Sequence, residues 1–443
     1  MPNRSDRKLD DGIQANGACL ASRTLLVVAH DFPPIRSPQS IRAAALAREL
    51  ARAGATVEVL TRTMAPGTTE PPGHEQLTIH RASPGLFEAA VDRIASRRRG
   101  RSADPSHGPT KPSVHPSVLN WKGQAIRGLR RLRARLLFPD DRVAWVPAAR
   151  RLLVERLAGA HFDAALVMHE PAAALLLTKT LDDARLPWVA DLADPVLARY
   201  TPMHWRHRAF QLEASIVARA RAVIVTNAET GVLLRARHAS LQGEVRVIPQ
   251  GFDPVPMPPA KNDGALRLVY TGRFYAFRDP TPLLEAVGTQ EGIELVIAGP
   301  EMPDAVIRAA EAWPASIQIV GELDHEAARR LQASADVLVS VGNSGTTQTP
   351  GKVYEYFGVA RPVLHIASDP EDPIPRLLLA AGRGLGCKAE PASIKDELQR
   401  LLIAKRSGQI SALFDLSDAA VEQFSWPALG RRLAGVFSEV LAP

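Results

Sequence analysis

The chain has 443 residues, more than one hydrophobic core usually accommodates, so two or three domains are expected. An apolar content of 46% and a charged content of 23% are those of an ordinary soluble globular protein, and no run of 18 apolar residues could form a membrane-spanning helix. The net charge of +7 is local, because residues 93–135 hold twelve lysines and arginines and one acid, Asp104, which leaves the rest of the chain at −4.

The cysteines and the first residues indicate the compartment. Cys19 lies in a polar leader and Cys387 is the only other cysteine, so a structural disulfide is not expected and a reducing, cytoplasmic location fits. Residues 1–23 contain three aspartates and no apolar core. They are therefore predicted to be a disordered tail and not a secretory signal peptide.

The first half of the chain alternates apolar runs with helical patterns. Most of the runs are continuously apolar, which is typical of strands buried on both faces of a parallel sheet. The predicted strands are residues 24–30, 56–60, 76–82, 163–169, 187–192, 222–227 and 245–250. A helix is predicted over 40–54, with Gly54 as its terminator.

Two segments interrupt this alternation. Residues 96–118 are rich in Arg, Ser, Pro and His and are predicted to be a mobile loop. Residues 122–138 have leucines along one side and arginines along the other, a pattern typical of an amphipathic helix that binds an anionic membrane surface. An ordinary domain helix with a solvated basic face remains the alternative. No recognition module accompanies the charge, so a nucleic-acid partner is not expected.

The second half repeats the plan of the first. The proline-rich residues 251–265 predict a linker between residues 24–250 and residues 266–425. The strands predicted after it are 266–272, 293–299, 317–322, 336–341 and 361–367, and residues 426–443 are predicted as a C-terminal helix. The sequence thus favours an α/β protein of two doubly wound, Rossmann-like domains that face a ligand-binding cleft.

The stretch TPGKVYEYFGVARPVL, residues 349–364, predicts an anion site. Pro350 suits the first turn of a helix, and Gly351 lets another group approach the backbone. Backbone N–H groups at a helix start attract anions, and Lys352 adds a positive charge. Glu355 would lie on the same helix face as Gly351, where its carboxylate could accept two hydroxyl hydrogen bonds. An anion beside a diol describes a nucleoside diphosphate.

Several stretches in order resemble glycosyltransferase family 4, closest to the branch that builds bacterial surface polysaccharides. They are residues 31–62, 187–195, 247–253, 268–280, 294–300, 321–340, 349–364 and 424–441. The resemblance implies the GT-B fold, a nucleotide-sugar held mainly by the second domain, no metal or other cofactor, and retention of the anomeric configuration. It also implies that the C-terminal helix returns to the first domain.

The chain departs from the family pattern at several positions. Thr347 stands where the family has its first donor-site glutamate, and Ile35-Arg36-Ser37-Pro38 replaces a glycine-rich turn. Ala193 and Gln250 stand where Arg and Asn are usual. These changes leave the donor sugar open.

The resemblance and the strand ends together assign candidate site residues. The catalytic candidates are Arg278, Lys352, Glu355 and His169. The donor-binding candidates are Gly272, Arg273, Glu322, Leu323, Thr346, Thr347, Thr349, Pro350 and Gly351. The acceptor-side candidates are His30, Arg36, Ser37, Asp191 and Asp194, of which the two aspartates could instead cap a helix or hold an arginine.

The resemblance therefore implies a cytoplasmic glycosyltransferase at the inner face of the plasma membrane. Its donor would be a nucleoside diphosphate sugar, with UDP favoured over GDP, and its acceptor a lipid-linked glycan or polysaccharide. A nucleotide-sugar epimerase of the same fold and a catalytically silent nucleotide-binding protein are the alternatives.

Overall fold

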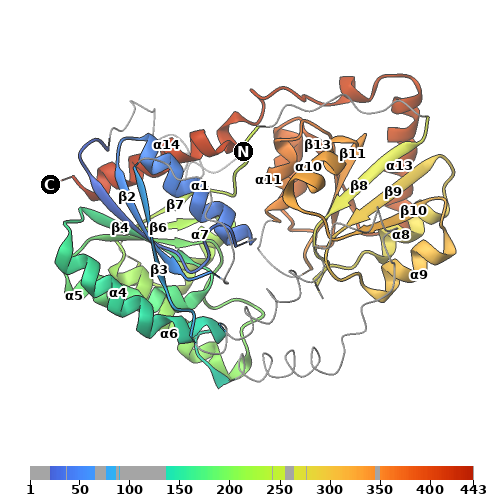
Figure 1. Cartoon of the computed structure of the whole chain (residues 1–443). Helices are drawn as coiled ribbons and strands as arrows, with labels where there is room; N and C mark the ends of the chain where they lie inside the picture. The colour runs from blue at the N-terminus through green and yellow to red at the C-terminus, as the bar shows by residue number, and fades with distance from the viewer. Residues whose placement is uncertain are drawn as a thin grey trace, which may run out of the picture. The chain divides into compact units, whose positions relative to one another are not determined.

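The computed structural model describes residues 20–35, 37–64, 76–85, 89, 136–241, 243–254, 264–275, 277–344 and 350–442. The chain divides into two compact units (Figure 1). The first contains the described residues up to Gln250 together with those from Trp426 onward, and the second contains Gly251–Ser425. The basic segment 93–135, with the predicted loop 96–118, lies outside the described residues. So do most of the predicted helix 122–138 and most of the predicted tail and linker.

The first unit is built on a seven-stranded parallel sheet in the order β3-β2-β1-β4-β5-β6-β7. The strands are β1 Thr24–Val28, β2 Thr56–Arg62, β3 Leu77–Ala82, β4 Ala164–His169, β5 Trp188–Leu192, β6 Ala222–Val225 and β7 Glu244–Val247. All seven lie within predicted strands or extend them by a residue or two. In the centre of the sheet Leu25 is paired with Val57 on one side and with Ala164 on the other.

Helices cover both faces of this sheet. They are α1 Pro38–Arg52, α4 Val146–Gly159, α5 Thr178–Asp183, α6 Arg206–Arg219, α7 Ala228–Arg237 and α14 Trp426–Val440, with short 3-10 helices η2 Asp141–Trp145, η3 Ala172–Leu177 and η4 Met203–Trp205. Ser37 caps α1 by accepting the Ser40 N–H, and Pro38 occupies the first turn. The observed helix therefore begins and ends two residues before the predicted helix, residues 40–54.

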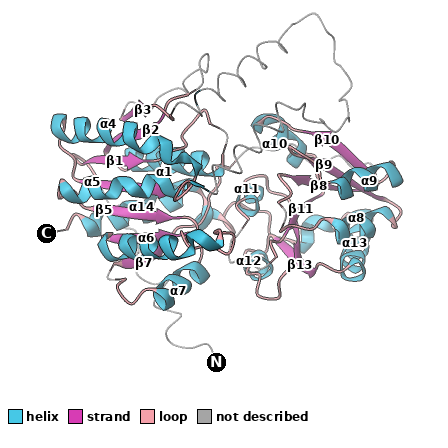
Figure 2. Cartoon of the chain, turned by 90° about the horizontal axis from the view of Figure 1, so that it is seen from below, coloured by secondary structure: helices cyan, strands magenta, loops and turns pink. Residues whose placement is uncertain are grey.

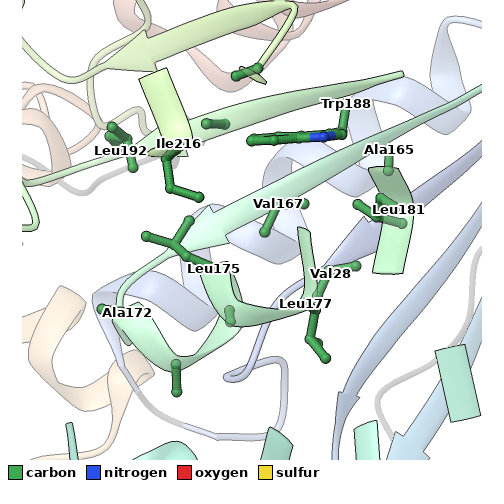
Figure 3. Packing of buried hydrophobic residues seen from close by; sticks show 14 of the residues in the cluster. Val28, Ala165, Val167, Ala172, Leu175, Leu177, Leu181, Trp188, Leu192 and Ile216 are labelled. Carbon is green, nitrogen blue, oxygen red and sulfur yellow. The ribbon is translucent and has the colours of Figure 1, made fainter. Parts of the chain in front are cut away.

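Alternate side chains of each strand enter different cores. Val28 and Val167 pack with Trp188 and the 3-10 helix η3 on one face (Figure 3). Leu25 and Val27 pack on the other face against α1 and α14. Strands buried on both faces explain why their sequences are continuously apolar.

The C-terminal helix belongs to the first unit, as the resemblance implied. Leu433 and Phe437 of α14 are fully buried in the core shared with α1. The contact is close at Gly430, where an added Cβ would lie 2.3 Å from Glu49 Cβ. Residues nearly 400 positions apart in sequence, as Glu49 and Gly430 are, therefore form one layer.

The second unit has a six-stranded parallel sheet in the order β10-β9-β8-β11-β12-β13 (Figure 2). The strands are β8 Leu266–Thr271, β9 Ile293–Ala298, β10 Ile317–Gly321, β11 Val337–Val341, β12 Val363–Ala367 and β13 Gly384–Lys388. The helices are α8 Thr281–Gly288, α9 Asp304–Ala312, α10 His325–Ala333, α11 Lys352–Phe357, α12 Ile374–Ala380 and α13 Pro391–Arg406. Five strands match predicted ones, whereas β13 was missed. Among the described residues, no helix combines the length and the apolar character needed to cross a membrane.

Candidate functional site

The carboxyl ends of β8 and β9 are packed backbone to backbone. Gly272, directly after β8, has a φ of +149° and donates its N–H to Ala298 O at 2.9 Å. A Cβ added to Gly299 would lie 2.0 Å from Gly272 O. Only glycine fits at both positions, so this edge of the sheet presents bare backbone to which another group can come close.

Arg278 is fixed beside this edge by neutral acceptors. Its Nε and Nη2 donate to Asn343 Oδ1 at 3.2 and 2.7 Å. Its Nη1 donates to Tyr270 Oη at 3.3 Å and to the Arg273 carbonyl at 3.2 Å. None of these acceptors is a carboxylate, so in these contacts the guanidinium keeps its charge for an anion.

Tyr270 supports this arrangement. Burial raises the pKa of Tyr270 to about 12, although Arg278 offsets part of the effect, so the phenol stays protonated. Its hydroxyl is 3.2 Å from the Arg273 carbonyl, to which it donates, and its ring stacks on Phe274 with centroids 4.3 Å apart. Arg273 contributes through its carbonyl, whereas its side chain is half exposed and lies 3.5 Å from Glu301.

The predicted donor-site helix is present as α11, with Pro350 and Gly351 at its start. The Nζ of Lys352 lies 2.5 Å from Glu355 Oε2, and the Glu355 side chain is 19% exposed. Two predicted catalytic residues are therefore neighbours. Arg329 is half buried and donates to the Asp253 carbonyl at 2.9 Å. Burial lowers the pKa of Arg329, and the charges of Glu355 and Asp253 offset part of the change.

Tyr356 fastens α11 to the ends of β8 and β11. Its hydroxyl lies 3.2 Å from the Thr271 nitrogen, which donates to it, and 3.3 Å from the Val339 carbonyl. Burial raises the pKa of Tyr356, and the charges of Glu355 and Arg278 both act on this phenol. Tyr356 thus holds the helix that carries Lys352 and Glu355 against the end of β8, the strand that Gly272 follows.

The other predicted donor residues are placed less closely. Glu322 is exposed and Leu323 half buried in the short loop after β10, where Asp324 caps α10. Thr346, Thr347 and Thr349 lie outside the described residues, as does Arg36 of the predicted acceptor side.

A cavity of about 410 Å³ lies in the first unit, at the carboxyl ends of β1 and β4. We call it the acceptor-side cavity. Two predicted residues line it, His30 after β1 and His169 at the end of β4. Its volume falls in the range of roughly 300–1,000 Å³ found for small-molecule sites.

His30, which is buried, and Asp31, which is partly exposed, form a pair in this cavity. His30 Nδ1 is 2.8 Å from Asp31 Oδ1, and Ser37 Oγ donates to Asp31 Oδ2 at 2.9 Å. Burial acts to raise the pKa of Asp31, but His30, Ser37 and Arg62 together outweigh it and hold that pKa below its ordinary value. Since the ionised carboxylate accepts from Nδ1, the other ring nitrogen of a neutral His30 is an acceptor.

His169 is oriented in a similar way by backbone. Its Nδ1 lies 2.9 Å from the Asp194 carbonyl, and the side chain is almost completely buried. Next to it, Glu170 accepts from Tyr200 Oη at 2.8 Å and from Gln39 Nε2 at 3.3 Å. Asp194 thus contributes a carbonyl that positions His169.

Asp191 does not line this cavity. It is fully buried, and its two oxygens accept from Arg42 Nε at 2.7 Å and Nη2 at 2.9 Å. Arg42 also donates to the carbonyls of Ile248 and Pro249. The alternative that Asp191 holds an arginine fits this geometry, because a buried arginine needs a counter-ion.

Sequence reasoning missed several residues that build these sites. They are Tyr270 and Asn343 in the second unit, and Asp31, Asp140 and Tyr200 in the first. Asn343 is the second residue after β11 and Asp31 follows His30, so the rule that selected polar residues after strand ends would have found both. No local pattern marks Tyr200 or Asp140, which reach the cavity from loops.

No protein-family model and no curated protein matches the chain, but solved structures do. A sucrose-phosphate synthase from Thermosynechococcus elongatus is 16% identical with a TM-score of 0.67, over 94% of this chain and 98% of that one. Anabaena HepE, solved with UDP and glucose, is 12% identical with a TM-score of 0.59 over 94% and 100%. An E. coli trehalose-6-phosphate protein bound with UDP-2-fluoro glucose is 11% identical with a TM-score of 0.60 over 95% and 99%.

These likenesses confirm the predicted fold. Two Rossmann-like units with parallel sheets, matched along nearly the whole chain, constitute the GT-B architecture. Membership of family 4 stays a prediction.

Proposed function

We propose that this chain is a glycosyltransferase that moves a sugar from a UDP-sugar to a hydroxyl group of an acceptor. The observation that carries the proposal is the set of charges at the ends of β8 and β11. Arg278 is held by neutral groups, and the Lys352–Glu355 pair lies on α11, which Tyr356 fastens to β8. Both belong to the unit that the resemblance assigns to the donor. Two proteins of the same fold are named for complexes with UDP or a UDP-sugar, which supports uridine as the base.

In the proposed reaction the diphosphate is the leaving group. As the bond from the sugar carbon to the phosphate oxygen breaks, negative charge grows on the diphosphate. Arg278 and Lys352 would stabilise that charge, and Gly272 and Gly351 let phosphate oxygens approach the backbone. These cations make a divalent metal unnecessary, and retention of configuration is proposed from the resemblance.

Glu355 would bind the ribose of the donor. A carboxylate can accept both hydroxyl hydrogen bonds of a diol, whereas it would repel a phosphate. Its contact with Lys352 holds the carboxylate close to the cation that the diphosphate would use. The lysine would thus bind the phosphate and the glutamate the neighbouring diol, the two groups that a nucleoside diphosphate presents side by side.

We propose a lipid-linked glycan or polysaccharide as the acceptor, presented at the cytoplasmic face of the membrane. The proposal rests on the charge of residues 93–135 and on the pattern of residues 122–138 in the sequence. Liposome flotation should require anionic lipid and weaken with salt. Flotation unchanged after replacement of Arg130, Arg131, Arg133 and Arg135 by Ser would contradict the membrane part of the proposal.

The test of transfer is to incubate the chain with labelled UDP-glucose or GDP-mannose and a bacterial lipid extract. We expect label in the lipid fraction with a UDP-sugar, and strong loss of it in Arg278→Ala. The matched control is Arg330→Ala, which removes an exposed arginine of the same unit. Tight UDP binding without any lipid-borne label would refute transfer to a lipid-linked acceptor.

A further inference from the structure

We infer that the acceptor-side cavity binds a sugar ring that carries no phosphate, either neutral or amino-bearing. The inference rests on the proposed function, since it names the class of acceptor for the same reaction. It is carried by the cavity's charge, by one buried nitrogen without a partner and by an aromatic wall.

The charge of the cavity is negative. Four carboxylates line it, those of Asp31, Asp140, Asp141 and Glu170, and Arg142 is the one lysine or arginine among the described residues of the lining. Asp31 is also paired with Arg62, which lies 3.7 Å away outside the lining, so the excess of negative charge comes mainly from Asp140 and Glu170. Arg142 lies 3.5 Å from Asp141 and is thereby partly neutralised. A phosphate group, with nearly two negative charges, would be repelled here. A hydroxyl could instead donate a hydrogen bond to a carboxylate, and an ammonium group would be attracted by its charge.

The buried nitrogen is Nε2 of His30. His30 is 1% exposed and lines the cavity, and its Nε2 has no hydrogen-bond partner among the described residues. A buried polar atom without a partner costs free energy, so a ligand that supplies one is favoured. Because Nδ1 is held by Asp31, Nε2 is the ring nitrogen left for a ligand, and it can accept from a hydroxyl when the ring is neutral.

Other groups add hydrogen-bonding capacity and an apolar surface. The Tyr200 hydroxyl donates to Glu170 at 2.8 Å, so the cavity wall carries a phenol and a carboxylate side by side. Phe138 and Trp205 lie with ring centroids 5.3 Å apart in the lining, and both are partly exposed. Aromatic rings beside carboxylates offer a sugar ring one surface for its C–H face and acceptors for its hydroxyl edge.

The experiment is saturation-transfer NMR on the full chain with three probes at equal concentration: methyl α-D-glucopyranoside, D-glucosamine and D-glucose 6-phosphate. At about 10 mM, where a millimolar ligand is largely bound, the first two should show transfer and the phosphate should bind about tenfold more weakly. Equal or stronger transfer to glucose 6-phosphate, or no transfer to any sugar, would overturn the inference.

A charge-reversal variant allows a second test that compares two ligands on one protein, so that only the ratio of their binding is needed. Asp141→Lys should raise glucose 6-phosphate binding relative to methyl glucoside. The control is Asp183→Lys, an exposed position in α5 away from the cavity, which should leave the ratio unchanged. A ratio unmoved by Asp141→Lys would contradict the electrostatic argument. UDP binding is measured on the same samples, so failure of the proposed donor site is seen separately from failure of this inference.

Discussion

Arg42 and Asp191 form an ion pair inside the first unit. Both side chains are almost completely buried, and the arginine also donates hydrogen bonds to two backbone carbonyls. Removing either partner would leave a charge in the protein interior without compensation. A buried pair broken on one side typically costs about 3–5 kcal/mol.

Asp191→Ala should therefore lower the free energy of unfolding of the first unit by about 3–5 kcal/mol, measured by urea denaturation. Arg23→Ala is the control, because the exposed Arg23–Asp163 pair should contribute no more than about 1 kcal/mol. Equal losses in the two variants would mean that Asp191 is not structural.

Asp31 provides a prediction on pH. Its pKa in the folded chain is below 3.8, so the folded state binds the proton more weakly than the unfolded state. Its stabilising contribution is thus complete above the unfolded pKa and is lost as the pH falls through the folded one. The stability difference between the wild type and Asp31→Asn should be constant from pH 7 to about pH 5 and shrink at lower pH. Denaturant titrations along this range measure it, and a gap that widens in acid would contradict the ion pair.

The positions of several candidate residues follow from chain order. His30, His169 and Gly272 lie at the carboxyl ends of strands, where a parallel sheet places them, whereas their roles and that of Arg278 stay predictions. Asp191, near the end of β5, was selected in the same way, yet it is paired with Arg42, which lies among the mostly apolar buried residues of α1. That arginine was the signal that a buried counter-ion was needed.

At the scale of elements, α11 is short and depends on the strands for its place. It has six residues, four of them buried, and Tyr356 ties it to β8 and β11. An isolated helix of this length would not form in water, so packing and this hydroxyl hold Lys352 and Glu355 in position.

Tyr356→Phe should keep the ring packing but remove the acceptor of the Thr271 N–H. We expect a loss of about 1–3 kcal/mol in unfolding free energy and weaker UDP binding, because the helix that carries the charged pair is loosened. Thermal unfolding with and without UDP measures both. Stability reduced with unchanged UDP affinity would show that the site does not depend on this anchor.

The strand β13 shows where patterns fail at this scale. Its sequence GLGCK has two glycines and no β-branched residue, so propensity argues against a strand. It forms because it is paired with β12 along its length, and a Cβ on Gly384 would lie 2.1 Å from the Val363 carbonyl. The strand therefore depends on its close pairing with β12, a tertiary contact that the local sequence pattern does not show.

At the scale of the whole molecule, the return of α14 to the first unit links the two ends of the chain. The resemblance predicted this helix and its return to the first domain, whereas its packing against α1 is seen only in the structure. The alternation of strands and helices was enough to predict two doubly wound sheets, because continuous apolar strands have to be covered on both faces.

Gly430→Ala should destabilise the first unit by about 1–3 kcal/mol, because its Cβ would overlap Glu49 in the α1–α14 contact. Gly159→Ala is the matched control. It ends α4 with open space around it, so alanine should be neutral or slightly stabilising there. Unfolding followed by tryptophan fluorescence compares the two, and equal stabilities would indicate that α14 does not pack closely on α1.

The central claim, that Glu355 binds the ribose diol of a uridine diphosphate beside Arg278 and Lys352, is tested most directly by calorimetry with two nucleotides. The wild type should bind UDP about tenfold more tightly than 2′,3′-dideoxy-UDP, as expected for hydrogen bonds to a carboxylate. In Glu355→Ala the two nucleotides should bind alike, whereas Glu326→Ala, an exposed glutamate of the same unit, should keep the difference. A preference for UDP that persists undiminished in Glu355→Ala would contradict the account.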